Sequence, residues 1–283
     1  MSLVSYVAMA VAGGLGMYFG IGAFFELVYY RRRRHEPEAW KCQPRRFAPA
    51  RMRRHEFVLG TLNMIAGSLV SGVFAWRVAE GKLSAISFDT RLAAIPGAIA
   101  LTLAYFLATD CALYWAHRLL HRPLAFRWIH RWHHRYTSPT AFTAGAMHPA
   151  EFFLYQGIMV VPLLFVPVHV AGVIFVLVYQ NFVALVDHSG VRTRSWVSFQ
   201  PPAQFHDDHH VYFHVNYGQT LGLWDRVFGT WRRTDRRYGV DVFGGKGAPL
   251  GAAEGPPRLV DYTEDRGARA ATGQQSPVGG TAP

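Results

Sequence analysis

Eight histidines of this 283-residue sequence fall into three short clusters whose spacing can place imidazoles on one face of a helix. The cluster HRLLH separates two histidines by four residues, and HRWHH and HDDHH each place three at i, i+3 and i+4. Residues three or four apart are neighbours on a helix surface, and imidazole is the commonest metal-binding side chain. The clusters therefore predict a metal site built from His117, His121, His130, His133, His134, His206, His209 and His210.

The number of these histidines and the residue types around them limit the kinds of metal site that the sequence can form. HRLLH looks superficially like the HExxH of zinc proteases, but Arg118 replaces the general-base glutamate, which disfavours hydrolysis by a zinc-bound water. Haem takes at most two axial histidines, so haem ligation would leave most of the clusters unused. Zinc without a redox role would be expected to have a simpler four-ligand site. Many imidazoles with few carboxylates suit a pair of late first-row ions, and a dinuclear non-haem iron centre accounts for more of the pattern.

The composition indicates a membrane protein. The sequence is 51% hydrophobic and yet carries a formal net charge of +11, with a pI near 10.0. The apolar residues form long uninterrupted runs, and the positive charges collect in the loops between them, which disfavours a nucleic-acid binder. Cys42 and Cys111 are the only cysteines and stand far apart, so neither a disulfide framework nor a thiolate metal site is indicated.

Four apolar segments are long enough to enter or cross a bilayer, which requires about 20 residues for a helical span. The first three are residues 4–30, 57–76 and 92–116. The fourth, residues 152–186, is too long for one span and is interrupted by two prolines, so it predicts a helical hairpin that turns around residues 162–169. We therefore expect an all-α integral membrane protein with about four passes or hairpin arms and a histidine-rich helical cap.

The charges predict the orientation of this bundle. Residues 31–54 contain ten lysines and arginines against two glutamates, so the positive-inside rule places this loop in the cytoplasm. Counting the crossings then brings the three histidine clusters to the same side as this loop. We expect the clusters to face the cytoplasm.

An acidic residue stands at the end of the third apolar segment. Asp110 precedes Tyr114, His117 and His121 at steps of four, three and four, which makes a single helical stripe. A carboxylate near the end of a span is costly without a partner, so we expect a functional role in which Asp110 orients a ligand imidazole. The alternative is a hydrated aspartate at the membrane interface. His169 is expected at the hairpin turn, away from the clusters, and is assigned no ligand role.

The order HRLLH, HRWHH and HDDHH resembles the fatty acid hydroxylase/sterol desaturase superfamily, whose boxes run HxxxH, HxxHH and HxxHH. The likeness extends from about Ala108 to Trp231. It includes the segments TSPT, HPAE and DHSG between the boxes and YFHVNYGQTLGLWDRVFG after them. This last segment is most similar to the sterol C-5 desaturase branch.

The resemblance implies an O2-dependent di-iron membrane enzyme that hydroxylates or desaturates a C–H bond of a lipid, either sterol-like or fatty-acyl. It implies that the eight box histidines are ligands and adds His188 to them. It also implies a role for His148, either as a ligand, as a residue that lines the site or as a structural side chain. His214 is assigned no role. Because the sequence has no GxGxxG fingerprint between a strand and a helix, electrons are expected from an external donor, namely a cytochrome b5-like protein, a ferredoxin or a reductase.

We divide the chain into N-terminal spans with the basic loop (residues 1–91), a catalytic domain (92–243) and a disordered tail rich in Gly, Pro and Ala (244–283). The alternative function is a non-catalytic, histidine-rich membrane protein for metal binding or transport. A transporter would place its ligands near the middle of the bilayer, whereas the clusters here stand at and beyond the ends of apolar segments. This placement favours the enzyme.

Overall fold

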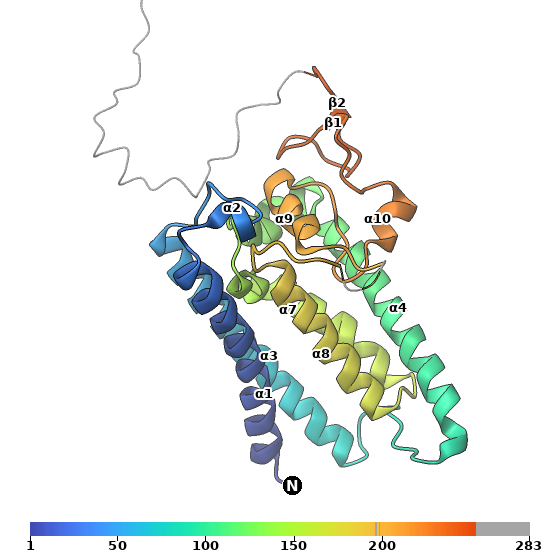
Figure 1. Cartoon of the computed structure of the whole chain (residues 1–283). Coiled ribbons are helices and arrows are strands. Elements are labelled where there is room, and N and C mark those ends of the chain that lie inside the picture. The colour runs from blue at the N-terminus through green and yellow to red at the C-terminus, as the bar shows by residue number, and fades with distance from the viewer. Residues whose placement is uncertain (196, 198, 253–283) are drawn as a thin grey trace, which may run out of the picture.

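The computed structural model describes residues 1–195, 197 and 199–252, and helices dominate this part of the chain. Helix α1 (Leu3–Phe25) begins at Ser2, whose side chain caps the backbone N–H of Ser5, and it continues as a π-helical turn over Glu26–Arg32. It packs along α3 (Ala50–Ala79) (Figure 1). The packing is close because small residues face the partner helix: a Cβ at Gly72 would lie 2.6 Å from the Cα of Val7.

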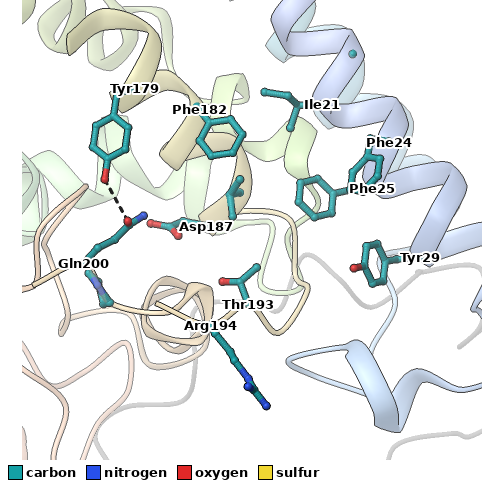
Figure 2. A pocket seen from close by; sticks show the side chains of 13 residues that line it. Ile21, Phe24, Phe25, Tyr29, Tyr179, Phe182, Asp187, Thr193, Arg194 and Gln200 are labelled. Atoms are coloured by element: carbon teal, nitrogen blue, oxygen red, sulfur yellow. Dashed lines mark hydrogen bonds between the residues drawn. The ribbon is translucent and has the colours of Figure 1, made fainter. Parts of the chain in front are cut away.

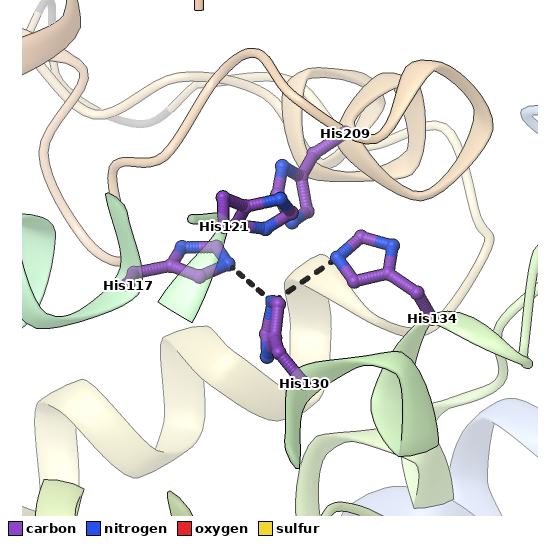
Figure 3. Close-up of side chains that lie close together, drawn as sticks. All are labelled: His117, His121, His130, His134 and His209. Atoms are coloured by element: carbon purple, nitrogen blue, oxygen red, sulfur yellow. Dashed lines mark hydrogen bonds between the residues drawn. The ribbon is translucent and has the colours of Figure 1, made fainter. Parts of the chain in front are cut away.

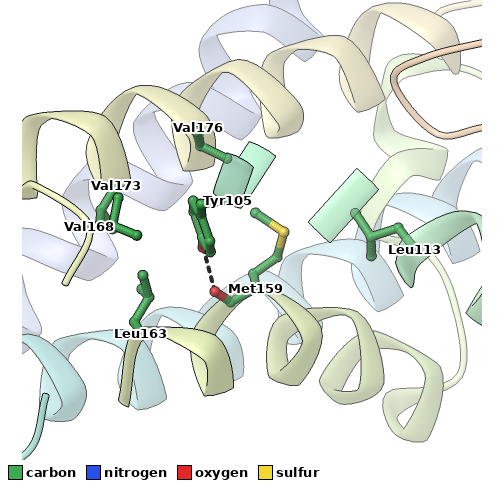
Figure 4. Close-up of a cluster of buried hydrophobic side chains, with 7 residues drawn as sticks. All are labelled: Tyr105, Leu113, Met159, Leu163, Val168, Val173 and Val176. Carbon is green, nitrogen blue, oxygen red and sulfur yellow. Dashed lines mark hydrogen bonds between the residues drawn. The ribbon is translucent and has the colours of Figure 1, made fainter. Parts of the chain in front are cut away.

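The other long helices are α4 (Ile95–Leu120), α7 (Pro149–Val160) and α8 (Val170–Asp187), and a 3₁₀ turn over Leu92–Ala94 precedes α4. Figure 4 shows the apolar core that these three helices share. The Tyr105 hydroxyl donates to the carbonyl of Met159, which satisfies the one polar atom of that ring inside the core. The core residues are Tyr105, Leu113, Met159, Leu163, Val168, Val173 and Val176.

Helices α7 and α8 form the hairpin that the two prolines predict. A 3₁₀ turn over Val161–Leu164 follows α7, and α8 begins after His169, whose Nδ1 accepts from the backbone N–H of Ala171 (3.2 Å). The connection between α3 and α4 lies against this turn, since the N–H of Ser87 donates to the carbonyl of Val168 (2.9 Å). His169 therefore caps a helix at the end of the bundle where the chain begins (Figure 1).

Within the described part of the chain, four helical stretches are long and apolar enough to cross a membrane: Leu3–Arg32, Ala50–Ala79, Leu92–Leu120 and Val170–Asp187. Helix α7 has 12 residues, hence a length of about 18 Å, whereas a bilayer core is about 30 Å thick. The first arm of the hairpin is therefore too short to cross by itself. The predicted class, an all-α integral membrane protein, is confirmed.

Shorter elements gather at the end of the bundle opposite the N-terminus (Figure 1). The Lys41–Val191 bridge and the donation from the Arg192 guanidinium to the carbonyl of Glu38 (2.9 Å) hold the basic loop against the segment after α8. The loop and the histidine clusters thus share one end. The elements there are α2 (Pro37–Trp40), α5 (Pro123–Ala125), the π-helical Phe126–His130, α6 (Arg131–His134), the 3₁₀ turn Ala141–Gly145, α9 (Ala203–Tyr212), α10 (Leu223–Phe228), β1 (Arg236–Arg237) and β2 (Ala248–Pro249).

Two details of this end bear on the sequence-based expectations. Lys41, one of the charges of the basic loop, is buried, and its Nζ donates to the Ser138 hydroxyl (3.1 Å). Burial lowers the pKa of the Lys41 ammonium, while the nearby Asp207 carboxylate opposes that shift. Of the expected tail, residues 253–283 lie outside the described residues, and strand β2 before them pairs with β1.

Candidate metal centre

Nine histidines form two adjoining groups in which the donor nitrogens within each group lie within 4.8 Å of one another. All nine side chains are buried. The rings of His134 and His210, which belong to different groups, have centroids 5.1 Å apart, so the groups adjoin. The first group is His117, His121, His130, His134 and His209 (Figure 3). The second group is His133, His188, His206 and His210.

The two groups do not follow the sequence clusters, because each HxxHH box divides its histidines between them. His130 and His134 belong to the first group while His133 belongs to the second, and on α9 the pair His206 and His210 belongs to the second group while His209 belongs to the first. Successive residues of a helix are rotated by about 100°. Positions i and i+4 therefore point about 40° apart, and position i+3 points away from i+4 toward the neighbouring group.

Backbone carbonyl groups fix the tautomer of several of these rings. The Nδ1–H donates from His188 to Ala184 (2.7 Å), from His209 to Val215 (2.6 Å) and from His133 to Ala146 (3.3 Å). A ring held in this way has its Nε2 free as a lone-pair donor. The fold thus turns Nε2 of these rings toward the interior of the groups.

His214 fixes the tautomer of His121, which sequence reasoning missed. The Nε2–H of His214 donates to the carbonyl of Val240 (3.1 Å), so its Nδ1 carries a lone pair. That Nδ1 lies 2.9 Å from Nδ1 of His121, which must therefore donate and leave its own Nε2 free. The sequence by itself assigns His214 no role, and the spacing of the sequence carries no sign of this contact.

Glu151 is a second residue that sequence reasoning missed. Its Oε1 accepts from Nδ1–H of His130 at 2.6 Å, and both side chains are almost completely buried. Glu151 is the last residue of the HPAE segment, which also contains His148. The structure places His148 outside both groups: its Nδ1 accepts from the N–H of Ala150 (3.1 Å) and caps α7. Of the three roles that the resemblance leaves open for His148, this position corresponds to the structural one.

Asp110 also differs from expectation. It is buried on α4 as the stripe predicts, but its carboxylate accepts from the backbone N–H of Thr220 (3.2 Å) and from Nε1–H of Trp224 (2.7 Å) instead of from an imidazole. The ring of His117 is held by a backbone group, the carbonyl of Tyr217 (2.8 Å). Asp110 therefore holds the segment that leads into α10 against α4. The same segment contains Tyr217, which contacts His117 of the first histidine group.

The two groups have the chemistry that a metal ion requires. Nε2 of His133 and Nε2 of His188 lie 3.1 Å apart, although both rings carry their proton on Nδ1, so two lone pairs face each other. Ligand nitrogens about 2.1 Å from an ion and at right angles would be ~3.0 Å apart. Burial lowers the pKa of His206, His209 and His210 well below its usual value, which keeps them neutral as ligands must be.

Unpartnered nitrogens support the same fit. Within the described residues, several buried imidazole nitrogens have no hydrogen-bond partner, and leaving such an atom unsatisfied costs about 1–3 kcal/mol. A cation bound between the rings would satisfy those that point inward. The unpartnered atoms are Nε2 of His121, Nδ1 of His134, Nδ1 of His206, Nε2 of His209 and both nitrogens of His210.

Comparison with known proteins places this site in a family. The family model described as fatty acid hydroxylase matches residues 102–230. Delta(7)-sterol 5(6)-desaturase ERG3 of Saccharomyces cerevisiae is 34% identical over 134 residues, which are 46% of this chain and 36% of the relative. ERG3 of Candida albicans is 37% identical over 135 residues, which are 46% of this chain and 34% of the relative. The Delta(7)-sterol 5(6)-desaturase of Leptosphaeria maculans is 37% identical over 136 residues, which are 47% of this chain and 37% of the relative. No solved structure matches the chain.

The matched stretch covers only about a third of the length of these relatives. A bundle of apolar helices with two groups of buried imidazoles at one end defines an integral membrane protein of the histidine-box class. Residues 102–230 of this chain match the fatty acid hydroxylase family model and are similar to sterol 5(6)-desaturases, in agreement with the resemblance of the boxes and of the segment that follows them.

Proposed function

We propose that this chain is an O2-dependent di-iron oxidoreductase that hydroxylates or desaturates a C–H bond of a membrane lipid, either sterol-like or fatty-acyl. The observation that carries the proposal is the pair of adjoining, buried, neutral imidazole groups at the end of a membrane bundle. Imidazole suits iron among the late first-row ions. The names of the relatives, which are sterol desaturases, support a lipid substrate.

In this proposal the nine grouped histidines hold two iron ions, which supply oxygen activation when they are bound. The protein contributes the geometry. Backbone carbonyls orient His133, His188 and His209, and the carboxylate of Glu151 orients His130 and raises its basicity as a ligand. Burial of all these rings keeps bulk water away from the reacting carbon.

The reaction requires an electron donor. Hydroxylation consumes one O2, two electrons and two protons for each C–H bond and releases water, and desaturation consumes the same and releases two waters. Because the sequence contains no dinucleotide fingerprint, a cytochrome b5-like protein, a ferredoxin or a reductase would supply the electrons. Exposed Arg122 and Arg127 stand on the segment between the first two boxes, where an acidic carrier would be attracted.

Transport or storage of metal is the competing function. A transporter places its ligands near the middle of the bilayer between helices. Here His121 follows the last residue of α4 and His188 follows the last residue of α8, so the groups stand at helix ends. This position favours chemistry on a lipid over passage of an ion.

Elemental analysis and lipid analysis test the proposal together. We expect the protein purified in detergent to contain two iron ions per chain. Mass spectrometry of lipids from cells that express it should reveal a species that has gained one oxygen or lost two hydrogens. Cells that express His210→Ala at the same level should lack this species. One metal ion per chain, or the same lipid change with both proteins, would contradict the proposal.

We also propose that the histidine groups face the cytoplasm, because the basic loop packs against the same end of the bundle. In a Cys111→Ala background, cysteines introduced at exposed His35 and Ser195 should react with a reagent applied from the cytoplasmic side. A cysteine at exposed Lys82 should react from the other side only. Labelling of His35→Cys and Ser195→Cys from opposite faces would refute this topology.

A further inference from the structure

Residues 40–43 of the basic loop form a strap, largely buried, across the histidine-rich end of the bundle. Trp40, Lys41 and Cys42 are buried, although the loop around them carries exposed arginines. The polar groups of a buried loop require partners within the protein, and these partners identify what the strap holds in place. The strap lies outside residues 102–230, which the family model matches.

The strap pairs first with the segment that follows His188. The backbone N–H of Cys42 donates to the carbonyl of Gly190 (2.9 Å), and the N–H of Arg192 donates to the carbonyl of Trp40 (2.7 Å). These two bonds form a short antiparallel bridge. The strap therefore fixes the chain directly beyond one ligand of the second histidine group.

The same segment continues into α9 and is held along its length. The hydroxyl of Thr193, the residue after Arg192, accepts from the N–H of Ala203, the first residue of α9 (3.0 Å). The Tyr179 hydroxyl of α8 donates to Oε1 of Gln200 (3.1 Å), and Figure 2 shows Thr193 and Gln200 on this connection. A displacement of the strap would therefore also displace the start of α9.

Gln43 joins the segments that carry the two HxxHH boxes. Its side-chain amide donates to the carbonyl of Thr137 (2.8 Å), three residues after the second box, and to Oδ1 of Asp207 (3.2 Å), inside the third box. The neighbouring Lys41 donates to the Ser138 hydroxyl (3.1 Å), so the strap contacts the segment after the second box twice. An amide donor requires only an acceptor oxygen, and a carboxyl group provides one whether or not it is ionised.

The second histidine group depends on such support more than the first. Among the described residues, His206 and His210 have no hydrogen-bond partner outside their group. Their positions therefore follow from the placement of α9, on which Asp207 stands between them. Four rings of the first group, in contrast, have a partner outside it. These partners are Tyr217, His214, Glu151 and Val215.

We propose that the strap positions the second histidine group, and that Gln43 sets the placement of α9 relative to the second box. The inference rests on the part of the proposed function that gives each group a metal ion, and it does not depend on the lipid reaction. Gln43 contacts no histidine of either group, so it is a positioning residue. Its loss should weaken the binding of one ion and leave the other unchanged.

Gln43→Met tests the proposal, because methionine has a similar length and no N–H donor. In a chelator titration of the iron-loaded protein, one ion per chain should be released at a roughly tenfold lower chelator concentration than in the wild type, as the loss of two hydrogen bonds predicts. The other ion should be released as in the wild type. Cobalt(II) bound in place of iron should show altered visible absorption, which reports ligand geometry, for one ion only.

A second background identifies the affected ion. His210→Ala is expected to retain only the ion of the first group, so adding Gln43→Met should not change the titration of that remaining ion. A further loss of this ion in the double variant would overturn the proposal, because Gln43 would then act on both groups.

Gln156→Met is the matched control. The amide of Gln156 also donates two hydrogen bonds between segments, to the carbonyl of Gly67 (2.8 Å) and to the Ser71 hydroxyl (2.9 Å), but it joins α7 to α3. This variant should lose about as much thermal stability as Gln43→Met and keep the wild-type chelator titration. Identical titrations of the two variants would show that Gln43 contributes only to stability.

Tyr30→Phe and Tyr18→Phe repeat the comparison with a smaller change, which matters if Gln43→Met does not fold. The Tyr30 hydroxyl donates to the carbonyl of Ser189 (2.8 Å), on the segment that the strap holds, whereas the Tyr18 hydroxyl donates to that of Phe142 (2.9 Å). Only Tyr30→Phe should ease the release of one ion. The same titration for both tyrosine variants would contradict the proposal.

Hydrogen exchange of the metal-free protein separates this proposal from the proposed function. The backbone amides of α9 should exchange severalfold faster in Gln43→Met than in the wild type or in Gln156→Met. If the wild-type protein binds no metal while α9 depends on Gln43 in this way, the proposed function fails and the role of Gln43 in placing α9 stands. Unchanged exchange of α9 in Gln43→Met would refute the proposal whatever the metal content.

Discussion

Replacing His210 with alanine will abolish lipid oxidation and remove most of the iron from the second histidine group. This group has four imidazoles, and both nitrogens of His210 are buried without a hydrogen-bond partner among the described residues. The variant retains three donors for an ion that imidazoles alone must hold there. We expect no product above background and a metal content that falls toward one ion per chain.

The matched control for this prediction is His148→Asn. Its motif leaves His148 open as a ligand, a lining residue or a structural side chain, and its ring caps α7 outside both groups. Asparagine is itself a favoured N-cap residue, so this variant removes the imidazole and keeps the cap. Activity and iron content should stay near those of the wild-type protein. Loss of iron in His148→Asn equal to that in His210→Ala would return His148 to the metal site.

His209→Ala tests whether loss of one histidine has different effects on the two groups. His209 belongs to the group of five, so four imidazoles remain after its removal. We expect turnover to be lost, because the ligand geometry changes, but iron to be retained better than in His210→Ala. The sequence alone predicts equal effects, since both residues belong to the same HDDHH box. Elemental analysis of the two variants purified in parallel decides between these expectations.

The second prediction with a large effect concerns Glu151. Glutamine at this position removes the negative charge that accepts from Nδ1–H of His130 (2.6 Å), and so lowers the basicity of His130 as a ligand. Loss of such a partner typically costs about 10–100-fold in metal affinity or activity. We expect the chelator concentration that removes half of the iron to be about 10–100-fold lower than for the wild-type protein. Turnover should decrease with it.

Glu56→Gln is the control for this substitution. Glu56 is as deeply buried as Glu151, but its carboxylate accepts from the hydroxyls of Thr140 and Thr143 and contacts no imidazole. If burial of a carboxylate were the important property, both variants would lose thermal stability in detergent and retain their resistance to chelator. We expect only Glu151→Gln to lose that resistance. An unchanged chelator titration for Glu151→Gln would exclude it as a residue that positions His130.

The sequence by itself determined the long helices and most of the histidines that come together. Apolar runs predict the long helices because each backbone polar group inside a bilayer must be paired within its own segment. Pro162 predicts the interruption between α7 and α8 because it cannot donate to a helix ladder. The spacing of the boxes identified eight of the nine histidines that come together, and this spacing is a local property of the chain.

Only the tertiary structure decided how those histidines are shared and what surrounds them. His133 and His209 join groups away from their box neighbours, because the packing of α4, α6 and α9 determines which rings converge. Glu151 meets His130, and His214 meets His121 across 93 positions of sequence. No local spacing encodes such contacts, since they depend on how helices distant in the chain approach one another.

For Asp110, the sequence predicts that a partner is needed but not which residues provide it. Its position in the span correctly indicates that it needs a partner, because an isolated carboxylate is costly there. Which partner it finds depends on Thr220, in the loop before α10, and on Trp224 of α10, which supply the N–H groups. Residue type predicts that a buried charge requires a partner, and the packing of the chain decides which groups provide it.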